Sequence, residues 1–147
     1  MSSCLLIRIP RFLRRPNWTS YKLLLELKKK IWLWIAVNSH QQGILKWVVG
    51  NRSLKTFQQL WWVVRGWCCF LYITDGYPVY RCLIDDCDHL VSKTAMTRVE
   101  GENSRLRHYL ARLHRKTFCY SKSQAMLEAS IRLLIYYLKH RQVPVLT

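Results

Sequence analysis

The sequence predicts an α/β domain in which strands and helices pack as layers. Residues 31–37 and 44–49 are β-branched and aromatic runs separated by turn residues, which is typical of a β-hairpin. Residues 53–65 carry apolar side chains at helical spacing, and residues 67–74 are apolar on both alternating faces, like a strand buried between layers. Because strands alternate with crossover helices, a layered α/β architecture is expected.

The composition indicates a packed and strongly basic domain. The 147 residues include 24 Lys and Arg against 8 Asp and Glu, which gives a formal charge of +16. Half of the residues are hydrophobic and 13% are aromatic, which excludes a disordered basic tail. The length suits one domain. Its positive field attracts polyanions, nucleic acid above all, and an anionic membrane surface is the weaker alternative.

Neither a membrane span nor an export signal is expected. The best apolar runs, residues 31–37 and 66–74, stop well short of the roughly 20 residues that a spanning helix needs. Arginines and Pro10 interrupt the apolar stretch near the start, which a secretory signal would keep continuous. We therefore expect a cytosolic chain with six reduced, free cysteines.

The elements follow in order from local patterns. Residues 1–27 mix arginines, prolines and aliphatic residues without a clean period, so this end is poorly specified. Ser53 is placed to cap the first helix, and Gly66 to end it. The apolar face of that helix consists of Leu54, Phe57, Leu60, Trp61 and Val64. After the buried strand at residues 67–74, a short strand is expected within residues 90–93.

Two helices are expected to close the chain, one within residues 97–116 and one from Ser121 to about His140. Ser121 and Gln124 form the S-x-x-Q pattern of a capping box. In the first of these helices, at about 100° per residue, the apolar and basic positions separate onto opposite sides. Val99, Leu106, Leu110 and Leu113 lie on one side, and Arg105, His108, Arg112 and Arg115 on the other.

Two acids stand out in this basic chain. Glu100 lies at the border of the apolar stripe near a helix start, where an acid complements the helix dipole and pairs with arginines. Asp75 belongs to an Asp-Gly pair, a common turn. Asp75 also follows a buried strand directly, and ligands of open α/β sheets bind beyond the carboxyl ends of strands. Together the two carboxylates could hold a divalent cation.

The stretches "KKKIWLWIAV", "TDGYPVY" and "DHLVSKTAMTRVEGENSRLRHYLARLHRKTFCYSKS" resemble the insertion sequence one transposases, a family of DDE-type, ribonuclease H-like enzymes. The resemblance covers residues from about 28 to 140, and "LRHYLARLHRKTFCYSKS" is its most specific part. It implies a ribonuclease H-like mixed sheet flanked by helices, with a degenerate N-terminal strand. Asp75 matches the second acid of the triad in its T-D-G-aromatic-P context, and Glu100 matches the terminal Glu in its R-[IV]-E context.

The resemblance implies DNA transposition by phosphodiester cleavage and strand transfer, with Mg²⁺ or Mn²⁺ held by the catalytic carboxylates Asp75 and Glu100. The partner would be double-stranded DNA, at transposon ends and target, with a homo-oligomer when active and no membrane. The chain would act in the cytoplasm at the bacterial nucleoid. Basic residues near Glu100 are expected to hold the DNA backbone; they are Arg98, Arg105, Arg107, His108, Arg112, Arg115, Lys116 and Lys122.

The chain departs from the family pattern in three places. No aspartate precedes Asp75, so the first acid, expected in an Asp-Glu-x-Trp-type context before the lysines, is absent; Glu26 is a poor substitute. The family's end-recognition region, which looks like a zinc-binding and helix-turn-helix module, is not expected here. Glu102 and Asn103 stand where members often carry His-Asn. Residues 1–27 are interpreted as a poorly patterned basic segment, residues 28–140 as a partial catalytic domain, and residues 141–147 as a tail.

Other candidate sites have weaker patterns. Cys82, Cys87 and His89 form C-x4-C-x-H, a spacing outside the usual zinc patterns. Asp85, Asp86 and Asp88 lack EF-hand spacing, so they are expected to be solvated. Three functions therefore remain in consideration: an impaired transposase, a non-catalytic DNA-binding remnant, and a basic protein of membrane surfaces or ribosomes, which would not require the contexts of the two acids.

Overall fold

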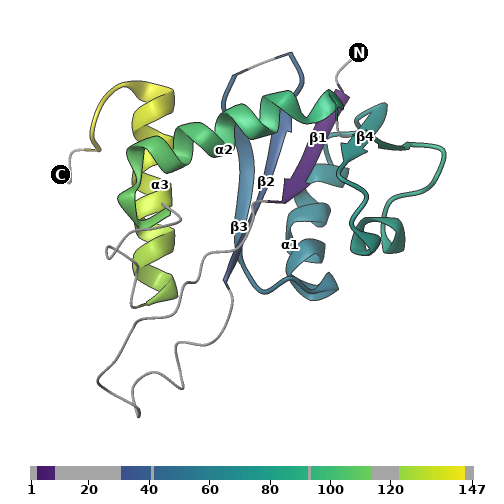
Figure 1. Ribbon diagram of the computed structural model, residues 1–147, viewed down its shortest axis with the longest axis horizontal. Coiled ribbons are helices and arrows are strands. Elements are labelled where there is room, and N and C mark those ends of the chain that lie inside the picture. Colours follow the sequence, from purple (N-terminus) through teal and green to yellow (C-terminus); the bar gives the residue numbers. More distant parts are fainter. Residues whose placement is uncertain (1–2, 9–30, 41, 93, 114–122, 145–147) are drawn as a thin grey trace, which may run out of the picture.

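The computed structural model describes residues 3–8, 31–40, 42–92, 94–113 and 123–144, and confirms an α/β architecture. A five-stranded sheet has the order β3-β2-β1-β4-β5 (Figure 1). Its strands are β1 (Ser3–Arg8), β2 (Trp32–Asn38), β3 (Ile44–Gly50), β4 (Leu71–Thr74) and β5 (His89–Val91). The helices are α1 (Leu54–Arg65), α2 (Thr97–Tyr109) and α3 (Gln124–His140), with short 3-10 turns η2 (Pro78–Cys82), η3 (Thr94–Met96) and η4 (Ala111–Leu113).

The sheet is mixed. β1 pairs antiparallel with β2, and β2 pairs antiparallel with β3, as expected of the hairpin. On the other side β1 pairs parallel with β4, and β4 pairs parallel with β5. The strand before the hairpin, for which the sequence has no clean period, therefore lies at the centre of the sheet.

Strand β2 supplies both hydrophobic cores because its side chains alternate between the two faces of the sheet. Leu33, Ile35 and Val37 pack with apolar residues of α2 and α3. Trp34 packs on the other face with residues of α1 and η2, including Phe57 and Tyr80. Phe57 is fully buried, and its ring centroid lies 5.0 Å from that of Tyr80 and 5.5 Å from that of Trp34. Helices thus flank the sheet on both faces, as predicted.

The predicted strand at residues 67–74 is wrong in its first half. The chain leaves helix α1 through a tight turn in which Cys68 adopts a φ of 48°, and β4 begins only at Leu71. Phe70 is 70% exposed. The residues just before Leu71 are apolar, but their backbone is used for the turn that follows the helix and cannot pair in the sheet. Their side chains are largely exposed to solvent.

Helix boundaries also differ from the predictions. α1 starts and ends as expected, but the Ser53 hydroxyl donates to Asn51 and makes no cap hydrogen bond. α3 is capped by Ser123, whose Oγ accepts a hydrogen bond from the amide of Met126. The predicted cap, Ser121, lies outside the described residues, and Gln124 instead donates to the carbonyl of Val49 and to Glu128. Helix α2 ends at Tyr109, because Leu110 is extended.

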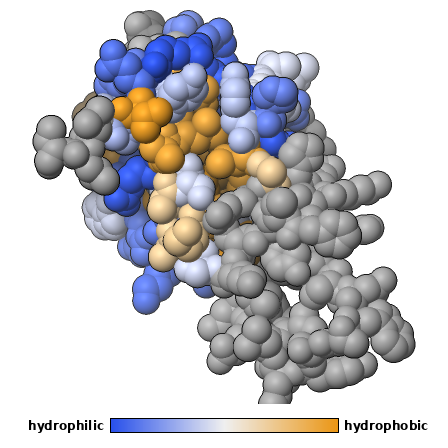
Figure 2. All heavy atoms as spheres, turned by 90° about the vertical axis from the view of Figure 1, so that its left-hand side faces the viewer, coloured by the Kyte–Doolittle hydropathy of each residue, from blue (hydrophilic) through white to orange (hydrophobic). Residues whose placement is uncertain are grey.

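The surface is not uniformly polar. Figure 2 shows hydrophobic residues gathered on the side of the molecule where α3 lies, with hydrophilic residues above them and to their left. The exposed large hydrophobic side chains of α3 are Met126, Leu133, Tyr136 and Tyr137. Within the described parts of the chain, no helix combines the length and hydropathy needed to cross a bilayer.

The expectation of six free cysteines is wrong for Cys69, which is disulfide-bonded. Cys68, Cys82 and Cys87 are free and exposed thiols. Sequence spacing did not indicate a bridge, because a disulfide depends on which chain segments the fold brings within bonding distance.

Candidate functional site

Asp75 lies directly after β4, at the end where the strand leaves the sheet. Its Oδ1 accepts a hydrogen bond of 3.2 Å from the backbone amide of Tyr77. Gly76 has a φ of 80°, and its amide donates to Thr74 Oγ1. The carboxylate therefore has a local role in shaping the turn, in the manner of an Asx turn, while it stays at the carboxyl end of a buried strand.

Strand β1, which pairs with β4, carries no acid. Leu5 pairs with Ile73, so the same register carried forward puts Ile7 beside Asp75. None of the six residues of β1, Ser3–Arg8, is Asp or Glu. The described part of the chain thus offers no carboxylate on the neighbouring strand to join Asp75.

The two acids of α2 have different environments. Glu100 lies in the first turn and is exposed, whereas Glu102 is only 5% exposed. Residues two apart on a helix project about 160° from each other at 100° per residue. Glu100 and Glu102 therefore lie on opposite flanks of α2, and the sequence offered a signal for this, because Glu102 falls next to the stripe of Val99 and Leu106.

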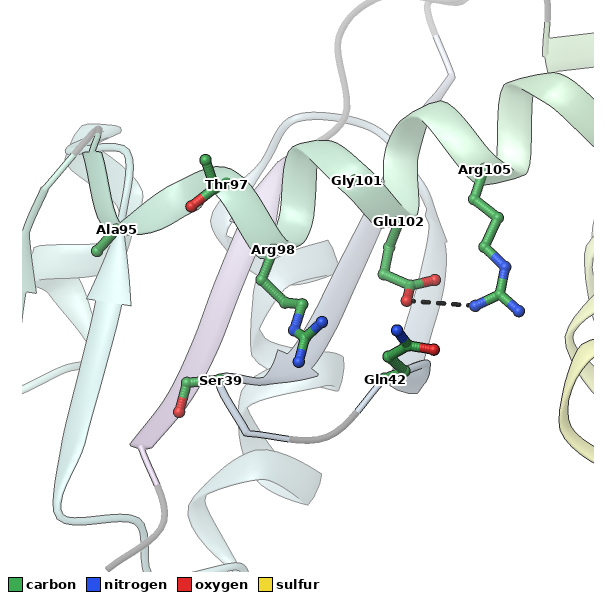
Figure 3. Close-up of a pocket in the computed structure, with 8 residues that line it drawn as sticks. All are labelled: Ser39, Gln42, Ala95, Thr97, Arg98, Gly101, Glu102 and Arg105. Atoms are coloured by element: carbon green, nitrogen blue, oxygen red, sulfur yellow. Dashed lines mark ion pairs between the residues drawn. The ribbon is translucent and has the colours of Figure 1, made fainter.

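Glu102 ties α2 to the turn between β2 and β3. Its Oε1 accepts a 2.9 Å hydrogen bond from the amide of Gly43 and lies 3.5 Å from the guanidinium of Arg105. Figure 3 shows Arg98, Glu102 and Arg105 projecting from α2 towards the segment that carries Ser39 and Gln42. These side chains line a pocket of about 610 Å³. This role of Glu102 was not predicted from the sequence, because Gly43 is 59 residues away along the chain.

The predicted DNA-binding residues divide into three groups. Arg98 and Arg105 are partly buried and line the pocket. Arg107 is also partly buried, while His108 is exposed near the end of α2. Arg112 lies beyond the helix in η4 and its side chain is outside the described part; Arg115, Lys116 and Lys122 lie outside the described residues. Because α2 stops at Tyr109, the predicted basic face does not continue along one helix to Arg115.

His89 bonds to the end of β4. Its Nε2 lies 2.6 Å from the Oγ1 of Thr74, a fully buried residue. Burial lowers the pKa of His89, and the positive charge of Arg81 lowers it further, while Asp86 acts in the opposite direction. Cys82 contacts the carbonyl of Pro78. Among the described residues, no group of three or more His, Cys, Asp or Glu is arranged to hold a metal ion, the C-x4-C-x-H pattern and the aspartates that follow it included.

Fold and site together define a strongly basic α/β domain with an acid at the end of the inner strand β4 and an arginine-bearing helix, α2, across the sheet. Comparison with known families matches residues 18–142 to the family described as IS1 transposase. The chain therefore belongs to the IS1 transposase family.

Individual relatives agree with this membership. The chain is 33% identical over 113 residues to the insertion element IS1 protein InsB of Shigella flexneri and of Shigella sonnei, which covers 76% of this chain and 84% of those proteins. The same identity to the insertion element IS1 9 protein InsB of Escherichia coli (strain K12) covers 66% of that protein. No solved structure matches this chain.

Proposed function

We propose that this chain is the catalytic domain of a DDE-type transposase that binds double-stranded DNA and whose metal-dependent cleavage and strand transfer are impaired. Family membership supports transposition as the process. The mixed sheet flanked by helices on both faces supports the ribonuclease H-like fold that such enzymes share. The proposed domain spans residues 28–140, between the basic segment 1–27 and the tail 141–147.

Asp75 and Glu100 are the proposed remaining members of the carboxylate set. Cys4 pairs with both Asn38 and Tyr72, so the β2–β3 turn lies level with the start of β4, and Asp75 lies away from that turn. Helix α2 lies across the strands (Figure 1), so its two flanks face the two ends of the sheet. Glu102 faces the turn. Glu100, on the opposite flank, would project towards the end of the sheet that carries Asp75.

The observation that carries the impairment is the composition of β1. A two-metal site needs carboxylates that bridge and orient both ions, because charge and ligand geometry together hold them. The register of β1 and β4, carried forward from the Leu5–Ile73 pair, puts Ile7 beside Asp75, and β1 contains no acid. Asp75 and Glu100 would still bind Mg²⁺ or Mn²⁺ weakly, but the described residues do not fit a complete two-metal site. Mutation of residues that only support metal ligands typically lowers metal affinity or activity 10–100-fold. The loss of a ligand itself should therefore lower activity by more than about 100-fold.

DNA binding is proposed to rest on the positive charge of the chain, with the basic residues of α2 as the first contacts. A formal charge of +16 on a packed domain produces a potential that concentrates polyanions at its surface. Such a protein would act on DNA of the bacterial nucleoid in the cytoplasm. As in the family, it would do so as a homo-oligomer when active.

The experiment is a plasmid-nicking assay of the full chain in Mg²⁺ or Mn²⁺, with DNA binding measured on the same samples. We expect strong, salt-dependent binding together with weak metal-dependent nicking that Asp75→Ala and Glu100→Ala abolish. The control is Asp85→Ala, which removes an exposed acid of the loop before β5. Equal nicking by wild type and both variants would rule out Asp75 and Glu100 as the catalysts.

The second candidate function is a non-catalytic DNA-binding remnant. The incomplete carboxylate set favours it, and it predicts salt-dependent binding without any metal-dependent cleavage. Binding that is insensitive to salt would contradict both candidates.

A further inference from the structure

The pocket between α2 and the β2–β3 turn has the chemistry of an anion site. Two guanidinium groups, Arg98 and Arg105, face one carboxylate, Glu102, so the formal charge of these three is positive. Ser39, Gln42 and Thr97 add two hydroxyls and a side-chain amide to the lining. These groups come from two elements far apart in the sequence, and most of them donate hydrogen bonds, which suits a ligand rich in anionic oxygens.

Glu102 engages Arg105 only weakly. The 3.5 Å separation of their charged atoms is longer than the 2.7–2.9 Å of a charge-assisted hydrogen bond. The Glu102 oxygen nearest Arg105 also accepts the Gly43 amide at 2.9 Å, which is the shorter contact. Glu102 is thus held by the turn, and the Arg105 guanidinium, with five donors, keeps capacity for another anion.

Gly101 is a second, independent indication of a ligand. It sits inside α2 and lines the pocket, and a Cβ built on it would meet no atom within 4 Å. A glycine inside a helix costs stability relative to alanine, and packing among the described residues does not require it. A glycine in such a place lets a ligand approach the helix backbone closely.

We propose that this pocket binds a phosphate of the DNA backbone, clamped between α2 and the β2–β3 turn, and that Glu102 is an internal counter-ion which the phosphate displaces from Arg105. The inference rests on the proposed DNA binding, and it assigns part of that binding to one place. Arg98 and Arg105 contact the phosphate, Gln42 reaches it from the turn, and Glu102 restrains Arg105 in the absence of DNA.

The magnitude follows from counterion release. Each phosphate neutralised releases about 0.9 of a condensed cation, so one contact changes affinity roughly fivefold at 0.15 M salt and the slope of log K against log salt by about one. Arg98→Ala should therefore weaken binding of a short DNA duplex roughly fivefold and flatten the slope by about one.

Glu102→Gln keeps the oxygen that accepts the Gly43 amide but removes the charge that competes for Arg105. It should tighten duplex binding, because the phosphate no longer has to displace a carboxylate from Arg105, while the salt slope stays close to that of the wild type because the number of phosphate contacts is unchanged. The matched control is Glu128→Gln on α3, which makes the same change in net charge outside the pocket. Gly101→Leu places a helix-favouring side chain in the open space, so it should fold at least as stably as the wild type and lose affinity.

The experiment is fluorescence anisotropy of a labelled duplex over a salt series with the full chain, together with thermal unfolding of every variant. Tightening by Glu102→Gln beyond that of Glu128→Gln, and weakening by Arg98→Ala and by a stably folded Gly101→Leu, would support the clamp. If the wild type binds and these variants have wild-type affinities and salt slopes, the pocket is not a phosphate site, although the proposed function stands. If the wild type binds no DNA, the proposed function itself fails.

Discussion

The stability of the turn that carries Asp75 should depend on the protonation of His89. Thr74 Oγ1 lies 2.6 Å from His89 Nε2 and accepts a hydrogen bond from the Gly76 amide at 3.3 Å. With the proton of neutral His89 on Nδ1, the Thr74 hydroxyl donates to Nε2 and its oxygen accepts from the Gly76 amide. A protonated imidazole can only donate, so the buried Thr74 hydroxyl would lose its acceptor.

The sign of the pH dependence follows from the lowered pKa of His89. Burial, reinforced by Arg81, disfavours the charged imidazole in the folded protein. The unfolded chain, with an ordinary pKa near 6.5, therefore binds the proton more readily than the folded one. The contribution of neutral His89 is complete above about pH 6.5 and is lost as the pH falls through that value towards the lower folded pKa.

The expected magnitude is that of one hydrogen bond with a buried partner. Its loss costs about 0.5–1.5 kcal/mol, which for a domain of this size lowers the unfolding midpoint by about 2–4 °C per kcal/mol. The measurement is thermal unfolding by circular dichroism from pH 8 to pH 5. His89→Gln retains an acceptor for Thr74 but does not titrate in this range, so its midpoint should fall less on acidification than that of the wild type.

His40→Gln is the control, because the His40 side chain is exposed and its backbone amide donates to Asn38, far from Thr74 in the sequence. It should keep the wild-type dependence on pH. A His89→Gln profile parallel to the wild type throughout this range would refute the argument, since it would show that proton binding by His89 is the same in the folded and unfolded states.

Three further predictions concern the packing. Phe57→Ala should lower the free energy of unfolding by about 3–5 kcal/mol because a fully buried ring is removed. Phe70→Ala should lower it little, because the Phe70 side chain is exposed. Unfolding of both variants in urea measures the difference. Gly76→Ala should destabilise by about 1–3 kcal/mol and more than Gly43→Ala in thermal unfolding, because both have positive φ but only Gly76 would also clash with β5. Arg52→Lys should lose about 0.5–2 kcal/mol of cation–π stabilisation, and unchanged unfolding in denaturant would contradict it.

The sequence predicted those elements whose signal is local. The hairpin and α1 follow from the period of their apolar residues, and the structure agrees nearly residue for residue. The start of β4 at Leu71 could not be predicted from the apolar pattern. The residues from Trp67 to Phe70 are as apolar as the strand itself, although their backbone forms a turn. The end of α2 at Tyr109 could not be predicted either, because Leu110 and Leu113 continue the helical spacing of apolar residues beyond the end of the helix.

The candidate site was predictable to the extent that short motifs mark it. Asp75 was expected at the end of a buried strand, and it lies there. The hydrogen bond of Glu102 was not predicted, because its donor is the Gly43 amide, which only the folded sheet brings to α2. A buried acid needs a partner to offset its lost hydration, and a partner distant in sequence leaves no local pattern.

The two acids of α2 show how one helix can serve two ends of a sheet. Because they are two residues apart on the helix, Glu102 points towards the β2–β3 turn and Glu100 lies on the opposite flank. The Glu102–Gly43 hydrogen bond acts together with the buried side chains of Val99 and Leu106 to orient α2 about its axis, and that rotation sets the direction in which Glu100 projects. A change that releases Glu102 from the turn should therefore affect both flanks, whereas Glu102→Gln, which keeps the Gly43 bond, should alter the electrostatics of the pocket alone. Comparing Glu102→Gln with Glu102→Ala in the nicking assay separates these effects, because only the alanine variant should lose residual cleavage.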